Sequence, residues 1–326
     1  MNPGKLPFEK ERELLIRREE ETNPDFGCLP TERTIEELLK GCIINIDKPA
    51  GPTSARITDF VKEIIGTKKC GHSGTLDPGV TGVFPVGVGT GTKALHSLLI
   101  AGKEYLTLMR LHEEISERKL KKVLKRFTTK LYQTPPIKSN VNRVLRIREV
   151  YYTKLIESEV KDALFTVGCE AGTYIRRLCY DIGEVTGSGA HMQQLRRTRV
   201  ANFNEDTLFT LQQLKDAFVF WKEGDESELR KALLPMESAL SHLPKVTLSD
   251  SAIPSVTTGA QLAVPGILSV ESGISPGELV AVLSQKGEGV LYGSALVSSE
   301  DMVSLPKGLA IKTERVLMNP SIYSPK

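Results

Sequence analysis

The stretch of sequence that most constrains the fold of this chain runs from Gly71 to Gly82 and reads GHSGTLDPGVTG. It contains four glycines and one proline in twelve residues, so it cannot form a regular helix or a central strand. Its single carboxylate, Asp77, directly precedes Pro78, which biases the backbone at Asp77 towards an extended conformation. The stretch therefore predicts a stiff loop that presents one acid. That acid is either a nucleophile or base for a substrate or the acceptor in an ordinary surface turn.

The composition is that of an ordinary globular protein. The chain has 326 residues, of which 40% are hydrophobic and 25% are charged, and this length allows two domains, one with a large core. No apolar run approaches the roughly 20 residues that span a bilayer. The charged N-terminus lacks the apolar core of a secretory signal. We therefore expect a cytoplasmic protein with no membrane contact.

The sequence shows no pattern typical of a metal or nucleotide site. The five cysteines are scattered and include no C-x-x-C pair, and the five histidines have no metal-ligand spacing. This disfavours a disulfide framework and a metal centre. The glycine-rich run before Lys93 lacks the spacing of a phosphate-binding loop. We expect neither a metal nor a cofactor.

Charge is unevenly distributed along the chain. The net charge is only +3, but residues 1–40 carry 7 Lys/Arg against 10 Asp/Glu, whereas residues 138–199 carry 11 against 7. A basic stretch inside a nearly neutral protein indicates a local site for a polyanion. A solvated basic face explains the same charges equally well.

Strand and helix signals alternate up to Pro244. A short apolar run and a Lys-Pro turn lead to the capping residues Thr53 and Ser54, and the helical period that follows stops at Gly66. In the first half of the chain we further expect a short helix over 34–40, a strand over 42–47, an apolar helix ending near 100, a strand over 103–112 and a basic amphipathic helix over 117–127. Further on we expect strands near 151–152 and 164–168, a helix that follows Gly172–Arg176 and ends near 184, a helix within 205–223 and a short helix over 235–244.

The composition changes after Pro244. From Lys245 onwards Val, Ser, Gly and Leu dominate, and turn signals such as Thr258-Gly259 and Ser275-Pro276-Gly277 recur at close spacing. Short strands separated by frequent turns are typical of a small β-barrel. We therefore place a domain boundary at Pro244.

Four spaced motifs resemble those of the TruB/dyskerin family of pseudouridine synthases. The Gly71–Gly82 stretch resembles the family's catalytic motif G-H-x-G-T-L-D-P-x-x-x-G, with Ser73 at the variable position. The other three are Asp47–Ser54 (D-K-P-x-G-P-T-S), Thr134–Ser139 (P-P-x-x-S) and Gly172–Arg176 (G-T-Y-I-R). Beyond them, the pattern T-G-A-x-L-x-V-P-G-I within 245–319 resembles a PUA domain, an RNA-binding module.

The resemblance implies a set of site residues. Asp77 matches the catalytic acid, Arg176 its arginine partner, and Tyr105 an aromatic ring over the target base. Leu195 matches an apolar wall of the pocket, and Lys48 is expected to have a structural or RNA-phosphate role. The remaining expected substrate contacts are His72 and the candidate phosphate contacts Arg196, Arg197 and Arg199.

The resemblance also implies a fold and partners. We expect an α+β protein with three parts: an N-terminal extension (1–40) packed on the PUA domain, a catalytic domain (41–244) built on a mixed β-sheet with flanking helices, and a PUA domain with its tail (245–326). The E-T-N-P-D-F-G extension, the C-terminal module and the segment near Trp221 favour the archaeal dyskerin-type branch. Membership of that branch implies modification of rRNA, a box H/ACA guide RNA and small accessory proteins.

Two other functions remain open from the sequence. One is guide-independent modification of the uridine in the TΨC loop of tRNA. The other is a catalytically silent RNA-binding scaffold, against which the presence of Asp77, Tyr105 and Arg176 argues.

Overall fold

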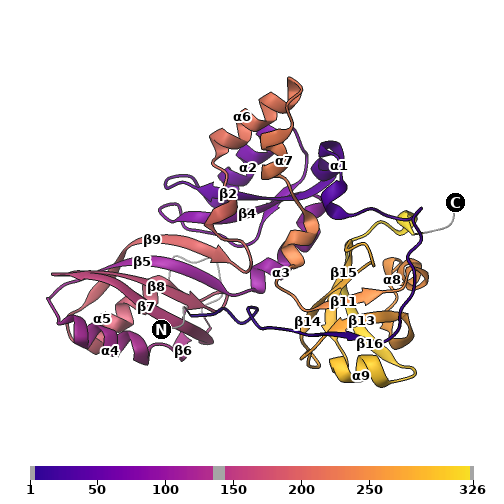
Figure 1. The fold of residues 1–326 in the computed structure, drawn as a ribbon. Helices are drawn as coiled ribbons and strands as arrows, with labels where there is room; N and C mark the ends of the chain where they lie inside the picture. The colour runs from indigo at the N-terminus through magenta and orange to yellow at the C-terminus, as the bar shows by residue number, and fades with distance from the viewer. Residues whose placement is uncertain (1–3, 135–143, 324–326) are drawn as a thin grey trace.

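The computed structural model describes residues 4–134 and 144–323, which form two sheet-based bodies side by side (Figure 1). Residues 135–139 of the P-P-x-x-S motif and the first residues (138–143) of the basic stretch lie outside the described residues. None of the helices in the described ranges is long and apolar enough to cross a membrane.

The catalytic part is built on a nine-stranded sheet. Its strand order is β10-β2-β4-β9-β5-β8-β7-β6, and β3 pairs with β4 off this path. The pairing of β4 with β9 is parallel and the other pairings are antiparallel, so the sheet is mixed. The strands are β2 (Gly41–Lys48), β3 (Cys70–His72), β4 (Thr81–Gly89), β5 (Lys103–Leu111), β6 (Lys130–Gln133), β7 (Arg146–Glu159), β8 (Asp162–Cys169), β9 (Ala190–Val200) and β10 (Leu234–Pro235).

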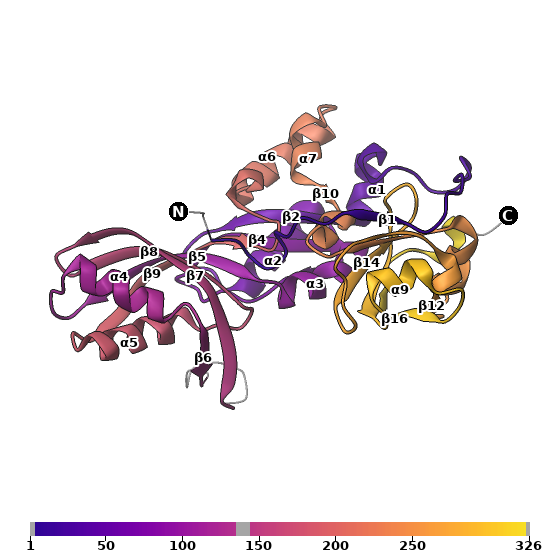
Figure 2. The same ribbon diagram turned by 60° about the horizontal axis from the view of Figure 1, so that its bottom comes forward.

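Helices cover the two halves of this sheet (Figures 1 and 2). On the β2–β4 half, α2 (Ser54–Ile65), α6 (Leu211–Lys222) and α7 (Ser227–Ala232) share one apolar core with the strands, and α1 (Ile35–Lys40) joins it. On the β5–β8 half, α4 (Glu117–Arg126) and α5 (Ile175–Thr186) form a second core. The predicted amphipathic helix over 117–127 is confirmed as α4, which buries Leu120, Val123 and Leu124.

Local sequence explains how α2 begins and ends. Thr53 caps the first turn, where its hydroxyl accepts a hydrogen bond from the Arg56 amide at 3.2 Å. Gly66 ends the helix in the left-handed region, with φ of 72°, where a glycine pays no Cβ penalty. The predicted start and stop of this helix are confirmed.

The C-terminal part is a seven-stranded sheet in the order β1-β13-β11-β14-β15-β16-β12. Its edge strand β1 (Leu14–Ile16) comes from the N-terminal extension and pairs antiparallel with β13, Leu15 opposite Val270. The other elements are β11 (Lys245–Leu248), β12 (Leu262–Ala263), β13 (Ile267–Glu271), β14 (Leu279–Leu283), β15 (Gly289–Ala295), β16 (Leu309–Val316), α8 (Ile253–Thr257) and α9 (Ser299–Ser304).

A shared apolar core joins the two bodies. Helix α3 (Leu95–Ile100) and the 3₁₀ turns Thr90–Ala94 and Met236–Leu240 bury side chains against Ala281, Tyr292 and Leu317 of the C-terminal body. This core continues under the catalytic sheet through Ile43 and Val83. The prediction of an α+β fold with a mixed catalytic sheet and a C-terminal β-rich domain is confirmed.

Candidate active site

Lys48 anchors the loop that carries Asp77. It lies at the end of β2 with none of its surface exposed, and its ammonium donates to the carbonyls of Pro49 (2.9 Å), Pro78 (3.0 Å) and Val80 (2.9 Å). Burial lowers the pKa of Lys48, and the negative charge of Asp77 opposes this shift. All three donors of the ammonium are used inside the protein, so none of them remains for an RNA phosphate.

The neighbouring motif residues hold the same loop. The Ser54 hydroxyl accepts from the Leu76 amide at 2.8 Å and donates to the Leu76 carbonyl at 2.9 Å. The Gly51 amide donates to the Pro78 carbonyl at 2.9 Å. Leu76 and Val80, on either side of Asp77, are each only 5% exposed. The Asp47–Ser54 motif therefore acts as a scaffold that fixes both flanks of the acid.

The Asp77 side chain itself is exposed to solvent and forms an ion pair with Arg176. The Asp77 side chain is 58% exposed and that of Arg176 is 51% exposed. Arg176 is the second residue of α5, whose first turn is fixed by the buried Ile175. The structure thus brings together the two residues expected to form the catalytic pair and leaves both accessible to a large ligand.

Tyr105 and Leu195 lie beside this pair on adjacent strands. Tyr105 is on β5 opposite Arg197 of β9, and Leu195 is opposite Thr107. Both side chains are half-buried and pack against the apolar cluster that contains Leu76 and Val80. Burial raises the pKa of the Tyr105 hydroxyl to about 12, against the opposite effect of the Arg197 charge. An aromatic ring and an aliphatic side chain therefore flank the loop with the acid.

Arg197 is buried beneath the loop and does not contact solvent. It is 1% exposed, and its Nε donates to the Val83 carbonyl at 2.8 Å. Burial lowers its pKa, but a guanidinium remains charged at neutral pH. The prediction that Arg197 contacts an RNA phosphate is wrong, because the side chain shares the face of β9 with Leu195 and points into the protein.

The close packing over Arg197 explains one glycine of the motif. Gly82 has φ of 100°, and a Cβ on it would lie 2.2 Å from the Arg197 carbonyl oxygen. A larger residue would therefore be strained in its backbone and would push β4 away from β9.

The other two predicted phosphate contacts are already paired with carboxylates. Arg196 binds both oxygens of Asp47, at 2.9 and 3.2 Å, and its Nε donates to Glu205 at 2.6 Å. Arg199 donates to Glu9 at 2.8 Å. These arginines tie β9 to the start of the Lys-Pro turn and to the N-terminal extension, so their charge is compensated within the protein.

His72 shapes the loop and carries no positive charge to it. Its Nδ1 accepts a hydrogen bond from the Gly74 amide at 3.3 Å, and its ring packs on Phe84 with centroids 5.1 Å apart. Burial, and secondarily the Arg197 charge, lower the pKa of His72. The neutral ring can contact a base or sugar but is not a cation for a phosphate.

Sequence reasoning missed a second buried cation under the loop. Lys103, at the start of β5, is 5% exposed and donates to the carbonyls of Leu98 (3.1 Å), Leu99 (2.9 Å) and Ala101 (2.9 Å). Burial, followed by the Arg197 charge, lowers the pKa of Lys103 to about 7. The sequence offers one indirect signal for buried positive charge in this region: strand alternation places residue 197 on the same face of β9 as the apolar Leu195.

Comparison with protein families agrees with this geometry. Residues 62–175 match the TruB family pseudouridylate synthase N-terminal domain, and residues 176–241 match the tRNA pseudouridylate synthase B C-terminal domain. A PUA domain matches residues 244–317 and a DKCLD domain matches residues 4–58. All four sequence motifs fall within these matches.

Relatives are similar over nearly the whole chain. The probable tRNA pseudouridine synthase B of Methanosarcina barkeri is 50% identical over 99% of this chain and 96% of its own length, and that of Methanopyrus kandleri is 48% identical over 98% and 95%. Two solved structures are equally similar. The chain in a crystal structure of a Cbf5-Nop10-Gar1 complex has a TM-score of 0.95 at 48% identity and covers 99% of both chains. The chain in a structure of an H/ACA RNP bound to a substrate RNA containing 2'-deoxyuridine has a TM-score of 0.92 at 47% identity, covering 98% of this chain and 99% of that one. With an exposed Asp77–Arg176 pair on a scaffolded loop and similarity of this extent, the chain belongs to the TruB family of pseudouridine synthases, in its dyskerin-type branch with DKCLD and PUA domains.

Proposed function

We propose that this protein converts uridine to pseudouridine in ribosomal RNA, with Asp77 as the catalytic carboxylate. The observation that carries the proposal is the solvent-facing ion pair of Asp77 with Arg176, on a loop whose two flanks are fixed by Lys48 and Ser54. Such a loop holds a reacting group in place without covering it, so that a large substrate can approach.

The chemistry is an isomerisation and needs no net oxidation. The C1′–N1 glycosidic bond breaks, the uracil rotates, and a new bond joins C1′ to C5, which then loses its proton while N1 gains one. An ionised carboxylate serves this reaction as a nucleophile, at the sugar C1′ or at uracil C6, or as a base that forms a glycal. All three routes require Asp77 to be charged when the RNA covers it.

Arg176 places a positive charge beside the Asp77 carboxylate. Loss of water around a carboxylate favours its neutral form, and a guanidinium beside it favours the charged form. The planar fork of arginine suits a carboxylate and stays protonated. The pair already exists before the substrate arrives, so the enzyme has only to exclude water around it.

Tyr105 and Leu195 receive the extruded base. Extrusion of a nucleotide from a stack costs a few kcal/mol. An aromatic face offsets about 1–3 kcal/mol of this cost by stacking. The raised pKa of the Tyr105 hydroxyl means that the ring remains neutral at physiological pH, so it offers stacking and a hydrogen-bond donor without a negative charge near the phosphates.

The target uridine is selected by a box H/ACA guide RNA, and small accessory proteins complete the particle. Support comes from the two similar solved structures, which are of a Cbf5-Nop10-Gar1 complex and of an H/ACA RNP bound to a substrate RNA. The names of the curated relatives favour a second activity, guide-independent modification of tRNA. Since rRNA and tRNA are cytoplasmic in archaea, we propose a cytoplasmic location for this protein.

We divide the chain functionally into an extension (1–40), a catalytic domain (41–244) and a PUA domain with its tail (245–326). The separate apolar core formed by residues between Val246 and Tyr323 supports the last boundary. Pairing of β1 with β13 supports the packing of the extension on the PUA domain.

Two parallel reactions test the function. The protein alone is incubated with tRNA, and the protein with guide RNA and accessory proteins is incubated with an rRNA fragment, each with uridine tritiated at C5 so that isomerisation releases tritium. Asp77→Asn should abolish release, whereas Asp181→Asn, which breaks the Arg177–Asp181 pair on the same helix, should not. Release only from the guided reaction supports the rRNA assignment, and release from tRNA alone supports the second activity. Undiminished release with Asp77→Asn would overturn the catalytic assignment.

A further inference from the structure

Gln133 is a buried amide near the active site that the mechanism above does not use. It is the last residue of β6, and only 2% of its surface is exposed. Its Oε1 accepts a hydrogen bond from the Tyr174 amide at 2.9 Å, and its Nε2 donates to the Tyr174 carbonyl at 3.3 Å. A buried amide is costly unless its polar ends are paired. Gln133 pairs both ends with the backbone of a single residue, and so holds the chain at position 174.

Tyr174 is the N-cap residue of α5, a helix that has no side-chain cap of its own. The first amides of a helix have no partner within the helix, and the usual caps are Ser, Thr, Asp and Asn side chains. In this protein α2, α4 and α6 each begin at a Thr or Ser that caps the first turn. Tyrosine has no short side-chain acceptor for this purpose. The fixation that the start of α5 lacks in its own sequence therefore comes from Gln133 on a neighbouring strand.

This end of α5 carries the arginine of the active site. Arg176 lies two residues after Tyr174 and pairs with Asp77. Because 51% of the Arg176 side chain is exposed, its position depends on the path of the backbone more than on packing of the side chain. Ile175, which is 4% exposed, fixes the inner side of the turn in the apolar core. A shift of the backbone at Tyr174 would be transmitted directly to the ion pair.

The turn before α5 is attached to the β6–β7 pair at a second point as well. These two strands pair antiparallel and extend from the end of the sheet (Figure 2). The Glu170 carboxylate accepts hydrogen bonds from the Arg148 guanidinium at 3.2 Å and from the Glu149 amide at 3.1 Å. The Arg148 and Glu170 side chains are 22% and 39% exposed, so water screens this contact. The fully enclosed attachment of the turn is the one made by Gln133.

We propose that Gln133 is a positioning residue for the reaction. It holds the backbone of Tyr174, and this fixes the place from which Arg176 reaches Asp77. The proposal rests on the proposed function, in which this ion pair does the chemistry. Because Gln133 is buried and acts through the backbone, its loss should slow the chemical step and leave the binding of RNA unchanged.

The test uses three variants of the full-length protein. Gln133→Met removes both hydrogen bonds and keeps most of the length and volume of the side chain. Gln133→Glu keeps an acceptor for the Tyr174 amide, but its carboxyl group donates to the Tyr174 carbonyl only when it is protonated. The matched control is Asn202→Leu, since Asn202 is a partly buried amide that donates to the Ser238 carbonyl at 3.0 Å and lies beside the core shared by the two bodies.

Two measurements are made on each variant. Single-turnover tritium release over a range of protein concentrations gives the maximal rate and the half-saturating concentration. Hydrogen exchange, followed by mass spectrometry of the peptide over 170–180, reports the protection of the Tyr174 amide independently of activity. Circular dichroism identifies any variant that does not fold, and Gln133→Glu carries the test if Gln133→Met is one.

We expect Gln133→Met to lower the maximal rate about 10–100-fold, as a displacement approaching 1 Å would, with an unchanged half-saturating concentration and faster exchange at Tyr174. Asn202→Leu should change none of these values. The rate of Gln133→Glu relative to wild type should rise as the pH falls, because protonation restores the missing donor.

Wild-type rate and exchange in Gln133→Met would overturn the proposal. So would a raised half-saturating concentration at an unchanged maximal rate, since that result assigns Gln133 to RNA binding. If the wild type itself releases no tritium, the proposed function fails, and exchange at Tyr174 still decides whether Gln133 holds the start of α5.

Discussion

Replacing Lys48 by methionine separates the loop-anchor role of this residue from a role in RNA binding. Methionine keeps much of the length and volume of the side chain and removes the ammonium. Three carbonyls then lose their donor, and two of them, on Pro78 and Val80, belong to the Asp77 loop. The hydrogen bonds from Ser54 to Leu76 would remain as the principal tether of that loop.

The magnitude follows from the three hydrogen bonds. Each hydrogen bond from a charged donor contributes roughly 1.5–3 kcal/mol, so the three together contribute roughly 4.5–9 kcal/mol. The folded wild-type protein is also destabilised by several kcal/mol because the Lys48 charge is removed from water, and Lys48→Met removes this penalty. The net expected decrease in the free energy of unfolding is therefore about 2–4 kcal/mol. A displacement of the reacting group by about 1 Å can slow a reaction about 100-fold, and we expect a rate loss of that order.

The assay combines urea unfolding, single-turnover tritium release and RNA titration across salt concentrations. Lys48→Met should lose stability and rate while its RNA affinity and salt slope stay unchanged, and the exposed Lys68 provides the control Lys68→Met. A variant with normal stability and rate but a salt slope reduced by about 1 would refute the anchor role, since that is the signature of a lost phosphate contact.

Three further predictions follow from the geometry. Gly82→Ala should lower the free energy of unfolding by about 2 kcal/mol or more, since the φ of Gly82 is 100° and an added Cβ would overlap the β9 backbone. Gly79 has open space around it, so Gly79→Ala should change the free energy of unfolding by no more than about 0.5 kcal/mol in the same urea titration. Burial lowers the pKa of His242 to about 4, so between pH 6.5 and 4 the unfolded chain binds a proton that the folded chain does not. The free energy of unfolding should therefore fall by about 2–3 kcal/mol as the pH falls through that window. His242→Gln should flatten this part of the stability curve, and His96→Gln, at an exposed histidine, should not. Tyr105→Leu should lower kcat/KM for tritium release about 10–100-fold through lost stacking, whereas Tyr105→Phe should retain most of the activity; equal losses for both would point to the hydroxyl instead of the ring.

Local chemistry made much of the fold predictable. The Thr53 cap and the Gly66 stop act within one turn of α2, and the apolar stripe of α4 depends only on helical spacing, so both helices could be predicted from neighbouring residues. The order of the strands could not. Parallel pairing of β4 with β9 joins residues more than a hundred positions apart, and no local signal encodes such a pairing.

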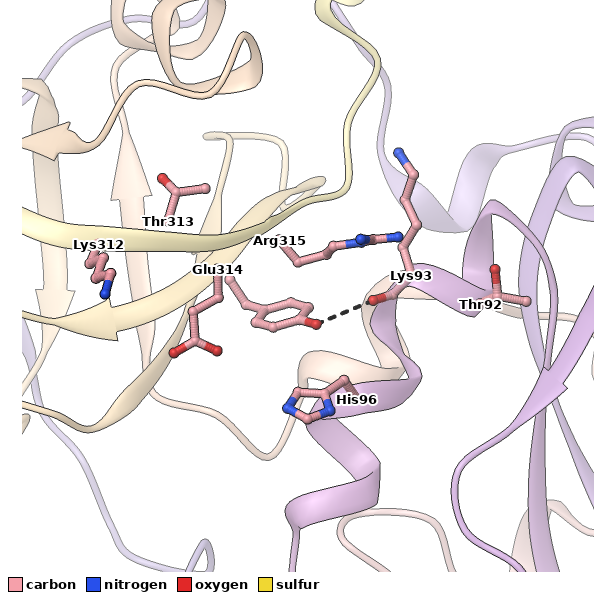
Figure 3. A pocket seen from close by; sticks show the side chains of 8 residues that line it. Thr92, Lys93, His96, Lys312, Thr313, Glu314 and Arg315 are labelled. Atoms are coloured by element: carbon pink, nitrogen blue, oxygen red, sulfur yellow. Dashed lines mark hydrogen bonds between the residues drawn. The ribbon is translucent and has the colours of Figure 1, made fainter.

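The sequence by itself determined the chemistry available to this protein: one acid before a proline in a glycine-rich loop, and motifs that resemble those of a single family of RNA-modifying enzymes. Tertiary structure alone decided what each cation does. Arg196 and Arg197 are neighbours in sequence, yet Arg196 pairs with Asp47 at the surface while Arg197 is buried under the loop, because successive residues of a strand point to opposite faces and only the assembled sheet defines which face is covered. Likewise, only the folded chain shows that Lys48 anchors the Asp77 loop and that Lys93 and Arg315, far apart in the sequence, line the same cavity (Figure 3).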